Sequence, residues 1–112
     1  MKFIINESQV DKMRQVTFKY LDDLSKNWSV NHFTHMEIRV YDGDRYVFDY
    51  STNERFFENE IHNVLKINSD LFNTVTGIFP LISEYDIMDW FNQKYNRDAD
   101  MVDVDYEDYE DY

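Results

Sequence analysis

Two runs of alternating apolar residues flank a turn-forming tripeptide, and they constrain the fold more than any other feature of the chain. The apolar positions are Met36, Ile38 and Val40 before Asp42-Gly43-Asp44, and Tyr46, Phe48 and Tyr50 after it. A period of two places these side chains on one face of a strand, and Asp and Gly favour tight turns. The pattern therefore predicts a β-hairpin. Because a slip of one residue would divide the apolar set between two faces, we expect a three-residue loop or an equivalent bulge.

The residues on either side of the hairpin follow a helical period instead. Apolar residues spaced by three and four positions predict a helix over about residues 7–26, with Asn6 as its N-cap. Ser69 and Ser83 are the expected caps of two further helices, the first of which ends before Pro80. Helices therefore precede and follow the predicted hairpin.

The segment between the hairpin and the second helix fits two structures. Ser51 and Glu54 have the spacing of a capping box, and apolar residues at 57, 61, 64 and 65 fit one face of a helix. Alternate apolar residues over 61–67 also fit a strand, which we favour because two strands alone rarely make a stable sheet. The expected fold class is therefore α+β, with an N-terminal helix, a three-stranded antiparallel meander, two C-terminal helices and an acidic tail.

The net charge is concentrated at one end of the sequence. The 112 residues include 23 acidic and 11 basic side chains, which gives a formal net charge of −12. Residues 98–112 hold eight of the acids and no Lys or Arg, so residues 1–97 contribute only −4. We therefore expect a single α+β domain over residues 1–97 and an acidic Tyr/Asp/Glu tail over residues 98–112.

The composition argues against several functional classes. A strongly negative chain is unsuited to direct binding of nucleic acid or of an anionic membrane, which both need a positive surface. The absence of cysteine excludes a disulfide scaffold, a thiol nucleophile and the common structural zinc sites. No run approaches the roughly 20 apolar residues of a transmembrane helix, and the first residues lack the apolar run of a secretory signal. We therefore expect a cytoplasmic protein.

Imidazoles cluster at one place in the sequence. His32 and His35 lie close to Glu37, and on an extended segment His35 and Glu37 share a face. A metal site needs a third ligand, which the spacing does not supply, so we interpret these residues as solvent-facing strand positions and expect no metal and no cofactor. The sequence also lacks a glycine-rich phosphate loop, G-x-S-x-G and H-E-x-x-H. We expect no enzyme, and a small metal-dependent enzyme is the minor alternative.

The acidic tail alternates carboxylates with valine and tyrosine. Val102, Val104 and Tyr106 alternate with acids, which is typical of an edge strand with its carboxylates outward, and a Tyr-Glu-Asp repeat follows. Carboxylates two residues apart on an extended chain are about 6.6 Å apart, close to the phosphate interval along one nucleic-acid strand. We interpret the tail as a partial nucleic-acid mimic, and the alternative is a solubility tail. The expected partner-binding residues are Asp103, Asp105, Tyr106, Glu107, Asp108, Tyr109, Glu110, Asp111 and Tyr112.

Both ends of the expected domain carry a resemblance. MKFIINESQ at residues 1–9 resembles the start of many small uncharacterised proteins of marine tailed phages, and INSDLF at 67–72 and DWFNQKY at 89–95 are similar to the ends of some of them. The scarcity of Gly, Pro and Ala, whose codons are GC-rich, agrees with the low-GC genome that the resemblance implies. The resemblance implies a phage-encoded protein, placed in the host cytoplasm or in the virion, and it brings no functional residues.

These patterns together predict a non-enzymatic, phage-type interaction protein. Its acidic tail is expected to dock on a basic surface of a protein partner, such as a nucleic-acid-binding protein, through charge complementarity. The main alternative is a structural or assembly protein, either a virion component or a homo-oligomer joined through an exposed strand edge.

Overall fold

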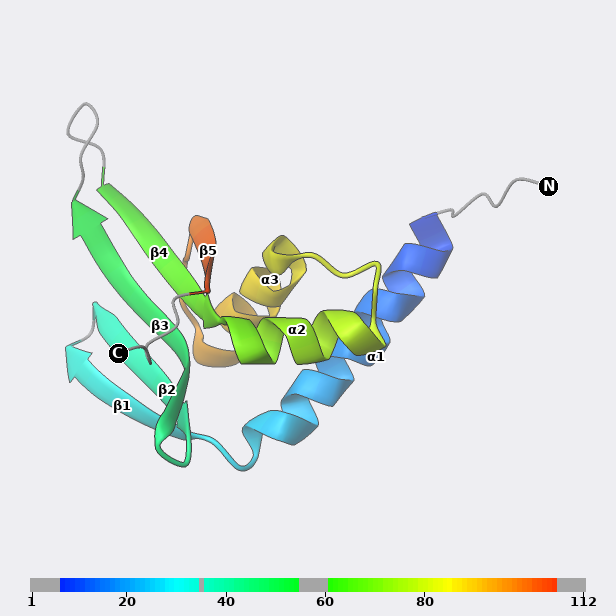
Figure 1. The fold of residues 1–112 in the computed structure, drawn as a ribbon. Coiled ribbons are helices and arrows are strands. Elements are labelled where there is room, and N and C mark those ends of the chain that lie inside the picture. The colour runs from blue at the N-terminus through cyan, green and yellow to red at the C-terminus, as the bar shows by residue number, and fades with distance from the viewer. Residues whose placement is uncertain (1–6, 35, 55–60, 107–112) are drawn as a thin grey trace.

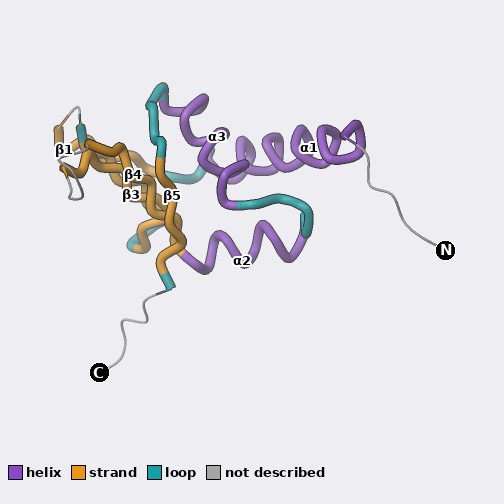
Figure 2. Tube along the Cα trace, turned by 90° about the horizontal axis from the view of Figure 1, so that it is seen from above, coloured by secondary structure: helices purple, strands orange, loops and turns teal. Residues whose placement is uncertain are grey.

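The chain forms an α+β fold in which helices lie on one side of a mixed sheet. The computed structural model describes residues 7–34, 36–54 and 61–106. Its elements in order are α1 (Glu7–Ser25), β1 (Ser29–Thr34), β2 (Glu37–Asp42), β3 (Arg45–Glu54), β4 (Ile61–Asn68), α2 (Ser69–Ile78), α3 (Glu84–Tyr95) and β5 (Met101–Asp105) (Figure 1). Figure 2 shows the described helices on one side of the sheet, so the opposite face of the sheet, here called the open face, has no helix over it.

The five strands follow one another in sequence order across the sheet. β1 to β4 are antiparallel, whereas β5 runs parallel to β4. A parallel pair needs a crossover connection, which α2 and α3 provide. The expected three-stranded meander is therefore wrong in extent, because β1 makes it four-stranded and β5 adds a parallel strand to the sheet. The two helices expected at the C-terminal end are present, but the chain continues from them into β5.

A bulge brings four of the six apolar residues of the predicted hairpin to one face. The turn of the hairpin contains Gly43 and Asp44, and the φ of +66° at Gly43 is a conformation that favours glycine. The register shifts between Val40 and Tyr41, so that the strands pair with an extra residue on β3. The resulting pairs on the helix side are Val40 with Phe48 and Ile38 with Tyr50. Ile38, Val40, Phe48 and Tyr50 therefore share one face as predicted, and the bulge rather than a longer loop aligns them. The prediction is wrong for Met36, which lies before β2 and is 47% exposed. It is also wrong for Tyr46, whose hydroxyl bonds to Asp105, because the bulge interrupts the alternation of β3 between Tyr46 and Phe48.

The helix boundaries agree with the sequence pattern, with one change of cap. α1 ends one residue before the expected end, and its expected cap Asn6 lies outside the described residues. Asn68, not Ser69, caps α2, because its side chain accepts a hydrogen bond from Asp70 N at 2.8 Å. Ser83 caps α3 in a capping box, as predicted. The strand expected over 61–67 is also confirmed, since these residues of β4 all pair with β3.

The hydrophobic core fills the space between the sheet and the helices. Its fully buried large side chains include Leu21, Ile38, Val40, Phe48, Leu65, Ile67, Val75, Ile87 and Phe91. Aromatic rings join the layers: Phe48 of β3 lies 5.8 Å from Trp28, 5.9 Å from Trp90 and 5.2 Å from Phe91, measured between ring centroids. Trp90 also donates its indole N–H to Asp22 of α1 at 2.9 Å. The core thus fixes α1 and α3 on the same part of the sheet.

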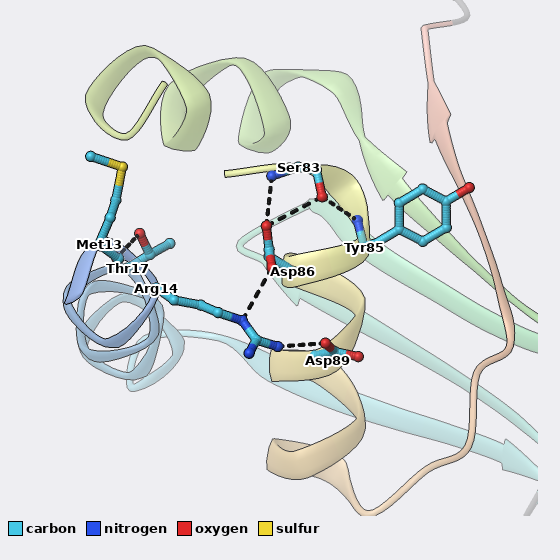
Figure 3. Close-up of polar contacts among 7 residues, drawn as sticks. All are labelled: Met13, Arg14, Thr17, Ser83, Tyr85, Asp86 and Asp89. Atoms are coloured by element: carbon cyan, nitrogen blue, oxygen red, sulfur yellow. Dashed lines mark hydrogen bonds and ion pairs between the residues drawn. The ribbon is translucent and has the colours of Figure 1, made fainter. Parts of the chain in front are cut away.

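A charged contact reinforces the packing of α1 on α3 (Figure 3). Arg14 Nη2 lies 2.6 Å from Asp89 Oδ2, and Arg14 Nε lies 3.1 Å from Asp86 Oδ1 at an angle that makes the contact ionic rather than a hydrogen bond. The other oxygen of Asp86 accepts the Ser83 N–H at 2.9 Å in the capping box. Asp86 therefore links the start of α3 to the middle of α1.

Replacing Arg14 with methionine tests this contact. The side chain of Arg14 is only 35% exposed, so we expect R14M to lower the free energy of unfolding by about 1 kcal/mol, the upper end for a pair of this exposure. The matched control is K26M, which removes the Lys26–Asp23 pair, where the lysine is 74% exposed. Urea denaturation followed by tryptophan fluorescence measures both variants, and equal stabilities for R14M and K26M would show that the contact contributes nothing.

Candidate functional site

After α3 the chain returns to the sheet through a closely bonded segment. Asn96 ends α3 in the left-handed conformation, with φ 55°. Asn92 of α3 then accepts the Ala99 N–H at 2.8 Å and donates its side-chain amide to Ala99 O at 3.1 Å. Ala99 is itself buried. These contacts fix the point at which β5 begins.

The first acids of the predicted tail are bonded to the start of β4. Asn63 donates its backbone N–H to Asp100 Oδ1 at 2.8 Å, and Asn63 O accepts the Asp100 N–H at 2.9 Å. The Asn63 side chain also donates to Asp98 O at 3.1 Å, and His62 Nδ1 lies 3.3 Å from Asp100 Oδ2. Residues 98–100 therefore belong to the folded structure and hold β5 in position.

β5 is an edge strand with its carboxylates on the open face, as its sequence pattern predicts. Val102 packs against the core on the helix side, so Asp103 and Asp105 at alternate positions face the other way. Asp103 is exposed, and Tyr106 directly after the strand is 62% exposed. Within the described part of the chain, no strand pairs with the outer side of β5. We call residues 101–106 the acidic edge.

The structure describes three of the nine expected partner-binding residues, and it places them differently. Asp103 and Tyr106 are exposed, whereas Asp105 is half-buried. The other six residues lie outside the described part of the chain, and they are Glu107, Asp108, Tyr109, Glu110, Asp111 and Tyr112. The acidic edge therefore leads directly into the rest of the acidic sequence.

Asp105 is held by a contact across the sheet. The Tyr46 hydroxyl donates a hydrogen bond to Asp105 Oδ2. Tyr46 O accepts a hydrogen bond from the side chain of Asn68 at 2.9 Å, and Asn68 lies opposite Asp105 in the register of β4 and β5. Asp105 thus anchors the end of β5, whereas Asp103 and Tyr106 are exposed.

A row of alternating charge crosses the open face next to the acidic edge. Arg39, Asp49, Lys66 and Asp103 are register neighbours on β2, β3, β4 and β5. Arg39 Nε lies 3.3 Å from Asp49 Oδ2, and the pKa of Arg39 is raised by its hydrogen bond with Tyr41 and by the negative charge of Asp49. This row is balanced in charge. The excess negative charge begins at β5 and continues toward the end of the sequence.

The histidine cluster does not form a site in the described residues. His35 lies outside them, while His32 and Glu37 are both exposed on neighbouring strands. Among the residues that the structure describes, no three His, Asp or Glu side chains are placed to hold a metal ion. No helix within residues 7–34, 36–54 and 61–106 is long and apolar enough to cross a membrane.

The roles of four residues that position the acidic edge were not predicted from the sequence. Tyr46, Asn63, Asn68 and Asn92 each bond to residues 98–105 or to their register neighbours. The abundance of asparagine was visible in the sequence. The bonds of Tyr46, Asn63 and Asn68, however, join positions far apart in the chain, which no local pattern shows.

No family model, no curated protein and no solved structure matches this chain. The function proposed for the acidic edge therefore depends on its own geometry and charge.

Proposed function

We propose that this chain is a non-enzymatic interaction protein whose residues 103–112, here called the acidic segment, dock on a basic surface of a partner protein. The observation that carries the proposal is the exposed position of Asp103 on an edge strand and of Tyr106 directly after it. Six further residues follow, of which four are acidic. An acid-rich segment attached to a folded edge attracts a basic surface and increases the rate of encounter. The tyrosines add flat rings that suit contacts with arginine.

The chemistry of the partner follows from the spacing of the acids. On an extended chain, alternate carboxylates repeat at about 6.6 Å, which is similar to the interval of phosphates along one strand of nucleic acid. A nucleic-acid-binding protein of the phage or of its host is therefore the proposed partner class. The Tyr46–Asp105 hydrogen bond supports this arrangement, because it fixes where the segment leaves the sheet.

Charge neutralisation tests the proposal while β5 stays intact. The tail variant replaces Glu107, Asp108, Glu110 and Asp111 by their amides. The matched control neutralises Asp11, Asp23, Glu37 and Asp44, four acids that are exposed on the folded domain. Both variants change the net charge equally, so nonspecific effects of charge are the same.

The measurement is affinity capture from a lysate of the bacterial host, with mass spectrometry, at about 50 mM and about 500 mM salt. We expect a basic protein to be retained by the natural chain and by the control variant at low salt, and at least tenfold less by the tail variant. High salt is expected to release it from all of them. Capture that is equal for the tail variant, or that does not change with salt, contradicts the proposal.

A second candidate function is assembly through β1. This strand forms the other edge of the sheet, and its sequence SVNHFT contains no Lys, Arg, Asp or Glu to block pairing with another chain. Its register shift between His32 and Thr34 opposes such pairing, however. Light scattering separates the candidates, because assembly through β1 requires a mass that increases with concentration.

A further inference from the structure

A pocket of about 250 Å³ is lined by the end of α1, the end of β2, the start of β3, the end of β4 and the start of α2. Its apolar lining comes from Leu24, Trp28, Val47 and Leu71. The pocket is smaller than the roughly 300–1,000 Å³ that is usual for small-molecule sites. Its size and lining therefore suit one apolar side chain rather than a cofactor.

The rim of this pocket carries more negative than positive charge. Arg45 Nη2 lies 2.7 Å from Asp70 Oδ2, so these two rim charges are paired. Asp42 is a third charged residue of the rim. With two carboxylates and one guanidinium, the rim favours an apolar group that is flanked by cations over one flanked by anions.

The pocket adjoins the residues that hold Asp105 at the end of β5. Tyr46 and Asn68 both line it. The same two residues hold Asp105, since Tyr46 donates its hydroxyl to that carboxylate and Asn68 lies opposite it in the register. Because the pocket and Asp105 share these two residues, a partner bound to the acidic segment has a second contact point close by.

We propose that this pocket receives an apolar side chain, of leucine or phenylalanine size, from the basic partner. The choice of a basic partner rests on the proposed function. An apolar anchor in a pocket typically supplies a large share of binding energy, whereas the surrounding charges direct encounter. The acidic segment thus attracts the partner and the pocket discriminates among basic sequences.

Two peptides of equal charge test the pocket on the full chain. The first probe is Lys-Gly-Lys-Phe-Lys-Gly-Lys and the second has glycine in place of phenylalanine. Dissociation constants come from NMR titration of labelled protein. We expect the phenylalanine peptide to bind about tenfold more tightly, as for partial burial of one ring. On binding of this peptide, we expect chemical-shift changes at the Trp28 indole and at the methyl groups of Leu24 and Leu71.

A filled pocket is the decisive variant. Thr74 is exposed and lines the pocket, so T74W places a ring in it with little risk to folding. Asn73 is exposed on the same helix and does not line the pocket, which makes N73W the matched control. T74W is expected to remove the advantage of the phenylalanine peptide and to leave the affinity of the glycine peptide unchanged, whereas N73W leaves both affinities unchanged.

The outcomes separate the pocket from the acidic segment. Three outcomes overturn the pocket proposal. They are equal binding of the two peptides to the natural chain, a phenylalanine advantage that survives T74W, and no binding of either peptide. The tail variant, with amides at 107, 108, 110 and 111, tests the proposed function separately. If the two peptides bind equally, or if the phenylalanine advantage survives T74W, loss of both affinities in the tail variant still supports the proposed function. A phenylalanine advantage that T74W removes, with affinities that the tail variant leaves unchanged, supports the pocket and contradicts the acidic docking segment.

Discussion

Truncation after Arg97 is expected to unfold much of the protein, whereas truncation after Tyr106 is expected to leave its stability nearly unchanged. The shorter chain lacks β5, the buried Ala99 and the bonds that Asn63 and Asn92 make with residues 98–100. We expect truncation after Arg97 to lower the free energy of unfolding by at least about 3 kcal/mol, the order expected for partly buried valines and several hydrogen bonds. That is a large part of the stability of a typical domain.

Thermal and urea denaturation of residues 1–97, 1–106 and 1–112, followed by circular dichroism, measure this difference. Equal stability of the 1–97 and 1–106 chains would show that β5 adds nothing to the fold. The comparison also matters for the binding experiment, because removal of residues 98–112 would confound loss of the acidic segment with loss of a strand.

Replacing Phe48 with alanine is expected to lower the free energy of unfolding by about 3–5 kcal/mol. The side chain is 0% exposed, and its ring lies against Trp28, which follows α1, and against Trp90 and Phe91 of α3. The cavity would lie at the centre of these rings, where little can move to fill it. Urea denaturation followed by tryptophan fluorescence measures the loss.

Two further variants keep this prediction testable if the alanine variant does not fold. F48L keeps most of the volume and is expected to retain a cooperative transition at a lower urea midpoint. Y85A removes an aromatic side chain that is 58% exposed, so its effect is expected to stay within about 0.5 kcal/mol. A loss below about 1 kcal/mol for F48A would contradict the central position of Phe48 in the core.

Much of the helix and hairpin structure could be predicted because local patterns determine it. The Ser83–Asp86 capping box and the alternation around Gly43 act over a few residues, and both are present in the structure. β1 was not predicted as part of the sheet because its side chains are mostly polar. An edge strand gains most of its stability from backbone pairing with one neighbour, which side-chain composition does not reveal.

The candidate site could be predicted only in part, for a related reason. The alternation of Val102 and Val104 with carboxylates predicted an edge strand, and β5 is one. The pattern could not show that Asp105 pairs with Tyr46, because these residues are distant in sequence and meet only when β3, β4 and β5 are aligned. The pocket beside them was not predicted either, since its lining comes from five elements that only the folded chain brings together.

The parallel pairing of β5 with β4 has a consequence for the order in which the sheet assembles. β1 to β4 pair with strands that precede or follow them directly in sequence. β5 can pair with β4 only after α2 and α3 have brought the chain back to the sheet. Contacts between distant parts of a chain carry a higher entropic cost of closure and form late. β5 is thus expected to be the last strand to dock, and as an edge strand it is expected to open before the centre of the sheet. A partner that binds only the docked strand would slow amide hydrogen exchange there and raise the melting temperature of the whole domain.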